Sequence, residues 1–159
     1  SDLYKAFWAD PPACAVGEPR TTYLGERSFP LVIQNVHRYF LYLALGFIAV
    51  LAIDAWKAMW FEGADGSEQF GIAVGTLVLT ANVILLSGYT LGCHSLRHLV
   101  GGGRDLFSDS KARKNCYDCV SALNRKHMLW AWCSLVCVAS ADAYVRLCSM
   151  GVIDDLRIL

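Results

Sequence analysis

The sequence predicts an all-α fold, a transmembrane helical bundle of three membrane-spanning helices that follows an irregular N-terminal segment. The first observation is composition: 55% of the 159 residues are hydrophobic and 18% are charged, whereas a typical soluble domain has about 25% charged residues. The second is three apolar runs, each about as long as the roughly 20 residues that a helix needs to cross a bilayer. The formal net charge is zero, so no nucleic-acid partner is expected.

The predicted elements follow in chain order. Residues 1–30 contain all four prolines and no long apolar run, which predicts an irregular segment on the cytoplasmic side. Residues 31–159 are expected to form the membrane domain. Its spans cover about residues 37–60, 69–96 and 127–152, and a basic loop of about residues 101–126 joins the last two spans. The middle span contains no formally charged residue, which is the strongest single indication of a membrane protein.

The lysines and arginines predict the orientation. The long loop holds six of them, Arg104, Lys111, Arg113, Lys114, Arg125 and Lys126. The short connection EGADGSE between the first two spans has none. Because cytoplasmic loops carry an excess of basic residues, the N-terminus and the long loop are expected in the cytoplasm and the C-terminus outside.

All four histidines fall at the cytoplasmic ends of the predicted spans. His37 opens the first span, His94 and His98 close the second beside Cys93, and His127 opens the third. His94 and His98 are four residues apart, so on a helix they share one face. Polar groups at this depth are costly unless they are paired or bind a metal, so the cluster predicts a cofactor site.

Several cofactors fit such a cluster. A structural zinc site would use four closed ligands. A haem b would need histidines from two helices, for example His37 or His127 opposite His94. A Rieske-type 2Fe-2S cluster takes two cysteines on one iron and two histidines on the other, and Cys93, His94 and His98 supply three of these four ligands from one helical turn.

The fourth ligand has two candidates. Cys116 and Cys119 form a C-x-x-C pattern in the basic loop, although a lone C-x-x-C is only moderately specific. Cys14 is the other candidate. Two functions without an iron–sulfur cluster are also considered: a membrane thiol oxidoreductase that uses Cys116 and Cys119, and a scaffold without redox chemistry.

Four stretches of this chain resemble the membrane subunit of the actinobacterial type of succinate dehydrogenase, which is respiratory complex II of a class without haem. They are FWADPPACAVGEPRTTYLGERSFPLVIQNVHRYF, YTLGCHSLRHLVGG, VSALNRKHMLWAW and DAYVRL. The resemblance implies a bacterial inner-membrane anchor that holds a Rieske-type 2Fe-2S cluster. It also implies a flavoprotein subunit and an iron–sulfur subunit as partners, besides membrane lipids. Electrons from succinate would pass through these subunits to a membrane quinone, and the succinate-oxidising site would lie on another chain.

The pattern of residues shared with the family favours one candidate for the fourth ligand. It includes Cys14, His37, the run Cys93 to His98, and His127, but not the C-x-x-C, so the resemblance favours Cys14 as the distant ligand. Members of the family carry further N-terminal spans. The resemblance therefore implies that a further small membrane subunit supplies these spans or that they are missing from this chain.

The quinone site needs hydrogen-bond donors near the cytoplasmic boundary. The candidates from the sequence are Arg38, Tyr39, Ser121, His127 and Trp130. In the third span, Asp142 and Arg146 are four residues apart, which predicts a neutralising ion pair.

Overall fold

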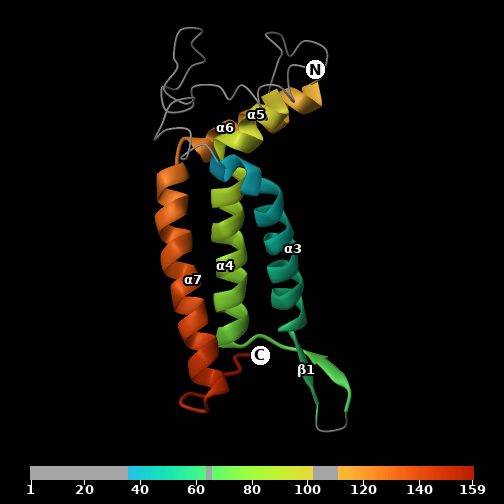
Figure 1. Cartoon of the computed structure of the whole chain (residues 1–159). Helices are drawn as coiled ribbons and strands as arrows, with labels where there is room; N and C mark the ends of the chain where they lie inside the picture. Colours follow the sequence, from blue (N-terminus) through green and yellow to red (C-terminus); the bar gives the residue numbers. More distant parts are fainter. Residues whose placement is uncertain (1–35, 64–65, 102–110) are drawn as a thin grey trace. The chain divides into compact units, whose positions relative to one another are not determined.

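The computed structural model describes residues 36–63, 66–101 and 111–159 (Figure 1). The irregular segment predicted for residues 1–30, which includes Cys14, lies outside these residues. The elements are the 3-10 helix η3 (Val36–Phe40), the helices α3 (Leu41–Lys57), α4 (Val74–Leu91), α5 (His94–Gly101), α6 (Lys111–Asn124) and α7 (His127–Ser149), and the strands β1 (Trp60–Glu62) and β2 (Glu68–Phe70). The two strands pair antiparallel in the connection between α3 and α4.

Among the described residues, three helices are long and apolar enough to span a membrane: Arg38–Lys57, Val74–Leu91 and His127–Ser149. Only 11%, 17% and 11% of their most apolar windows are buried inside the protein, so most of their apolar side chains face outward. Phe47, Trp132 and Leu135, for example, are 66%, 64% and 61% exposed. Water would disfavour so large an apolar surface, and lipid or protein must cover it. The predicted helical, multi-pass membrane fold is confirmed.

The chain divides into two compact units. One contains residues 1–44 and 90–127, and the other contains residues 45–89 and 128–159. Within the second unit, α4 contacts the residue that follows α3 and also helix α7. The Thr76 hydroxyl donates to the Ala58 carbonyl just after α3, at 2.9 Å, and the Trp130 ring of α7 lies against Gly88 of α4. Small residues at helix interfaces let the backbones approach closely.

The C-terminal tail is tied to the start of α4. The Asp155 carboxylate accepts hydrogen bonds from the Gly75 backbone N–H and from the Tyr144 hydroxyl, both at 2.8 Å. The Gly75 N–H belongs to the first turn of α4, whose N–H groups have no partner within the helix, and the helix dipole favours a carboxylate there. The Arg157 guanidinium lies 5.0 Å from the centre of the Phe61 ring. Asp155 therefore joins the beginning of α4 to the end of α7.

Replacing Asp155 with alanine is expected to lower the stability of the protein. The change removes two hydrogen bonds to a charged acceptor, one of them from a first-turn N–H of α4 that has no partner within the helix. We expect a clear decrease in the thermal unfolding temperature of the detergent-purified complex. Asp154→Ala is the matched control, because both side chains are exposed but only Asp155 accepts these two hydrogen bonds. Equal unfolding temperatures for the two variants would contradict a role for Asp155 in stability.

The second predicted span differs from the observed helix. The apolar run was expected to continue to residue 96, but α4 ends at Leu91 and a new helix begins at His94. The turn between them is held from two sides: the Cys93 N–H donates to the Thr90 carbonyl at 3.2 Å, and the Asn124 amide donates to the Gly92 carbonyl at 2.8 Å. The Gly92 carbonyl is thereby engaged by a side chain distant in sequence, which hydropathy cannot reveal.

The basic segment also differs from the prediction of a loop. Residues Lys111–Asn124 form helix α6, which packs against α5. The segment has three basic residues in its first turn and apolar residues later. Hydropathy therefore does not predict that it is a helix. A partner helix, rather than composition alone, stabilises it.

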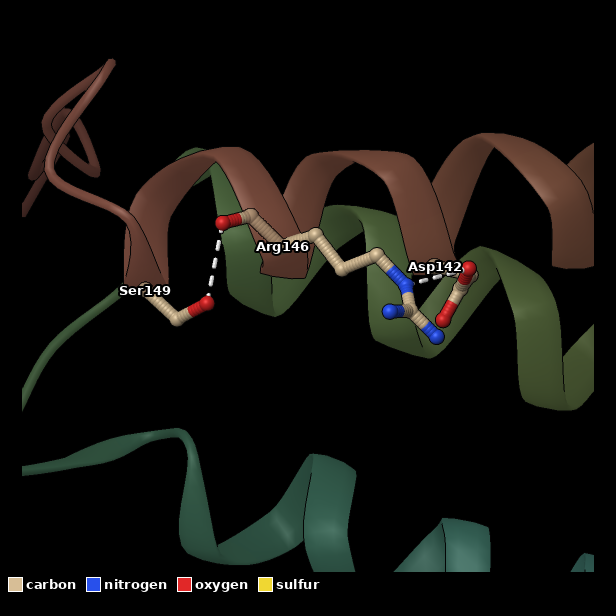
Figure 2. Close-up of polar contacts among 3 residues, drawn as sticks. All are labelled: Asp142, Arg146 and Ser149. Carbon is tan, nitrogen blue, oxygen red and sulfur yellow. Dashed lines mark hydrogen bonds and ion pairs between the residues drawn. The ribbon is translucent and has the colours of Figure 1, made fainter.

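The predicted ion pair of α7 is confirmed. Arg146 Nε lies 2.8 Å from Asp142 Oδ2, and both side chains are exposed (Figure 2). The Ser149 hydroxyl donates to the Arg146 carbonyl at 2.9 Å near the helix end (Figure 2). Pairing neutralises both charges, which lowers the free-energy cost of carrying them on a membrane-spanning helix.

Candidate functional site

Cys93 lies immediately before α5 and is 9% exposed. Its carbonyl accepts a hydrogen bond from the Arg97 N–H at 3.2 Å, which starts the hydrogen-bonding ladder of α5. The N-terminal end of a helix carries partial positive charge, so it favours negative groups. Cys93 is therefore placed where a thiolate ligand is stabilised.

Helix α6 holds the start of α5 in place. Asn124 donates to the Gly92 carbonyl at 2.8 Å, and Arg97 Nε donates to the Ser121 hydroxyl oxygen at 3.1 Å. The Arg97 guanidinium also lies 5.1 Å from the centre of the Tyr117 ring. Tyr117, Ser121 and Asn124 are spaced four and three residues apart, so they share the face of α6 that contacts α5. The sequence did not predict these links.

His127 begins its helix as expected, whereas His94 and His98 do not close the second span but lie in the separate helix α5. His94 is the first residue of α5, His98 lies four residues later in the same helix, and His127 is the first residue of α7. His94 and His127 are half-buried. Within residues 36–63, 66–101 and 111–159, no three histidine, cysteine, aspartate or glutamate side chains are grouped so that they could hold a metal ion. Cys14 and the side chains of His37 and His98 lie outside the described part, so the four-ligand set stays a prediction.

Cys116 and Cys119 lie in α6, not in a loop, and both are exposed. The helical repeat puts Cys119 on the face opposite Ser121 and Asn124, and Cys116 between the two faces. The C-x-x-C pattern thus points away from the side of α6 that supports Cys93. This arrangement favours a ligand from another segment.

The quinone candidates are distributed between the two units. Arg38 is 7% exposed, and one of its guanidinium nitrogens donates to the Tyr39 hydroxyl at 2.8 Å. Ser121 accepts from Arg97, which leaves its hydroxyl hydrogen for another acceptor. These residues and His127 belong to the first unit, whereas Trp130 belongs to the second.

Trp130 has a donor without an acceptor. Its indole Nε1 is buried and has no hydrogen-bond partner among the described residues. The ring is held against Gly88, where an added Cβ would lie 2.7 Å from Trp130 Cε3. Buried indole N–H groups usually have a partner, so Trp130 is suited to donate to a ligand.

Sequence reasoning missed Ser95. It lies in the first turn of α5 next to His94 and is 2% exposed, and its hydroxyl has no hydrogen-bond partner in the part of the chain that the structure describes. Its only signal in the sequence is its place in CHSLRH. A buried thiol, a half-buried imidazole and an unsatisfied hydroxyl thus follow one another in the chain at the start of α5, and these are residue types that a histidine- and cysteine-ligated cluster would use.

Comparisons with known proteins identify the family of the chain. The model of the family "Actinobacterial succinate dehydrogenase subunit SdhC" matches residues 1–151. A solved structure, the Mycobacterium smegmatis Sdh1 complex in the apo form, contains a chain with 44% identity and a TM-score of 0.72. The match covers 99% of this chain and 58% of that one. None of the curated proteins matches. The chain therefore belongs to the family of actinobacterial succinate dehydrogenase SdhC subunits.

Proposed function

We propose that this chain is the membrane anchor and electron-transfer subunit of a succinate:quinone oxidoreductase. It acts with a flavoprotein subunit and an iron–sulfur subunit, and it holds a Rieske-type 2Fe-2S cluster between the iron–sulfur subunit and the quinone. The observation that carries this proposal is the start of α5. There a buried Cys93 adjoins His94, and Asn124 and Ser121 of α6 hold the turn in place.

The proposed ligands are two cysteines and two histidines. Cys93 and Cys14 would hold one iron, and His94 and His98 would hold the other. When bound, the cluster supplies one-electron transfer between the partner's last centre and the quinone. The chain's own contribution is positional: the α5 N-terminus favours the Cys93 thiolate, and the Asn124 side chain holds the backbone just before it.

The proposed quinone contact is Trp130. Reduction of a quinone to a quinol consumes two electrons and two protons, and hydrogen-bond donors to the quinone carbonyls stabilise the charge that develops there. The buried indole N–H of Trp130 is such a donor, since the described residues offer it no acceptor. Gly88 has no side chain, so the Trp130 ring can pack directly against this part of α4.

The cluster is tested by spectroscopy of the purified complex. After reduction with dithionite, low-temperature EPR is expected to show the low average g value of a histidine-ligated 2Fe-2S centre. The optical spectrum is expected to be broad in the visible region. Sharp reduced α-bands without the EPR signal would instead support a haem b, bound by His94 opposite His37 or His127.

We also propose that the N-terminus and α6 face the cytoplasm and that the C-terminus lies outside. The basic residues around α6 support this orientation. Cys116 and Cys119 are exposed, so they are natural reporters for labelling. A membrane-impermeant maleimide is expected to label them in inverted vesicles but not in intact spheroplasts. Labelling from the outside, lost in a Cys116→Ser/Cys119→Ser variant, would reverse the assigned orientation.

The same double variant separates two functions. Because both thiols are exposed, the Cys116→Ser/Cys119→Ser protein is expected to retain succinate:quinone activity within about twofold of the unmodified complex. Surface substitutions away from a site usually change stability by less than about 0.5 kcal/mol. Abolished activity would support the thiol oxidoreductase alternative.

A further inference from the structure

Ser95 has the most buried polar side chain of the described residues, with 2% of its surface exposed. Its hydroxyl has no hydrogen-bond partner within residues 36–63, 66–101 and 111–159. Burying a hydroxyl without a partner is unfavourable, and the large majority of buried polar side-chain atoms in proteins have one. An acceptor that is not a described residue of this chain is therefore expected at this position.

Serines of helix α7 show the usual arrangement of a helical serine. Such a hydroxyl commonly donates to a backbone carbonyl three or four residues earlier. Ser134, Ser140 and Ser149 of α7 do so, to Ala131 at 3.0 Å, Val136 at 2.8 Å and Arg146 at 2.9 Å respectively. The Ser95 hydroxyl makes no bond of this kind. Ser95 thus differs from Ser134, which is similarly buried but has a hydrogen-bond partner.

The helical repeat places Ser95 with the proposed ligands. Position 98 is three residues after Ser95 and four after His94, so it neighbours both of them on the surface of α5, while positions 94 and 95 lie about 100° apart around the helix axis. Cys93 directly precedes this turn. The acceptor that Ser95 requires therefore belongs to whatever the Cys93–His98 turn binds.

We propose that the Ser95 hydroxyl donates a hydrogen bond to a sulfur atom of the 2Fe-2S cluster and thereby raises the reduction potential of the cluster. This inference rests on the proposed function. Hydrogen bonds to the sulfur atoms are one of the factors that set the potential of an iron–sulfur centre. The reduced cluster carries one more negative charge than the oxidised cluster, so a donor stabilises it more. Ser95 keeps its proton in both states, and one electron enters from the iron–sulfur subunit and leaves to the quinone.

The test is an EPR-monitored redox titration of the intact complex in membranes, with the Ser95→Ala, Ser95→Thr and Ser134→Ala variants. Ser95→Ala removes the donor with almost no change in volume. We expect about a tenfold lower ratio of reduced to oxidised cluster at a fixed applied potential, which corresponds to a midpoint about 59 mV lower for a one-electron couple. Ser95→Thr keeps a hydroxyl and is expected to titrate near the unmodified complex. Ser134→Ala, a buried serine whose hydroxyl is already satisfied, is the matched control.

Several outcomes would overturn the inference. An unchanged midpoint in Ser95→Ala would show that the hydroxyl does not act on the cluster. If the KM for quinone rose while the midpoint stayed unchanged, the hydroxyl would instead contact the quinone. Equal decreases in the alanine and threonine variants would show an effect of packing. If Ser95→Ala loses the signal altogether, a threonine variant with the original signal and midpoint supports the inference, and one without the signal contradicts it. Absence of the signal from the unmodified complex would reject the proposed function itself.

Discussion

Replacing His94 with alanine is expected to abolish the Rieske-type EPR signal and to lower succinate:quinone activity by more than about 100-fold. Loss of a group that only supports a metal ligand typically decreases metal affinity or activity by about 10–100-fold, and loss of a ligand itself should exceed this range. His94 opens α5 directly after the buried Cys93. In the described part of that turn, no other side chain has an imidazole that could replace the His94 ring as a ligand.

Two controls keep this result interpretable. Succinate oxidation measured with a soluble dye that accepts electrons before the anchor is expected to remain, which shows that the other subunits are intact and attached. His127→Ala is expected to keep the EPR signal, because His127 is not a proposed ligand of the cluster. Loss of a haem spectrum in both variants would support the haem alternative. Unchanged electron transfer to quinone in His94→Ala would instead leave the chain as a scaffold.

Replacing Gly88 with alanine is expected to decrease kcat/KM for quinone by about tenfold to 100-fold. The added Cβ would lie 2.7 Å from Cε3 and 2.8 Å from Cδ2 of Trp130, closer than real contacts allow, so the ring must move. Displacement of a positioning group by about 1 Å can decrease a rate by about 100-fold. The loss should therefore appear in quinone reduction, and the EPR signal of the cluster should persist.

Gly46→Ala is the matched control for this substitution. Gly46 lies in α3, where an added Cβ meets nothing within 4 Å, and alanine is the better helix former by about 1 kcal/mol. It should leave quinone kinetics unchanged. Trp130→Phe keeps a large ring but removes the N–H, so it should decrease kcat/KM in the same direction. Quinone kinetics in Gly88→Ala equal to those of Gly46→Ala would argue against Trp130 as a quinone contact.

Much of the fold could be predicted from local sequence. A membrane-spanning helix satisfies its backbone hydrogen bonds within one continuous segment, so length and hydropathy are enough to find it. The same holds for the Asp142–Arg146 pair, because residues four apart meet on any helix. The placement of His94 and His98 in one helix also followed from their spacing.

The site depends on contacts between segments distant in sequence, and the sequence did not reveal them. The apolar run from α4 continues in composition past Leu91, yet Asn124 engages the Gly92 carbonyl and the helix is interrupted there. The basic segment becomes helix α6 because it packs on α5. It thereby turns the conspicuous Cys116 and Cys119 outward.

The sequence alone determined the class of protein, its three spans and the residue types of a cofactor site. Only the tertiary structure decided where α5 begins, which face of α6 supports it, and that the hydroxyl of Ser95 is buried without a partner. The physical reason is that hydropathy and helical spacing are properties of neighbouring residues. Burial and hydrogen-bond satisfaction depend on which distant segments pack together.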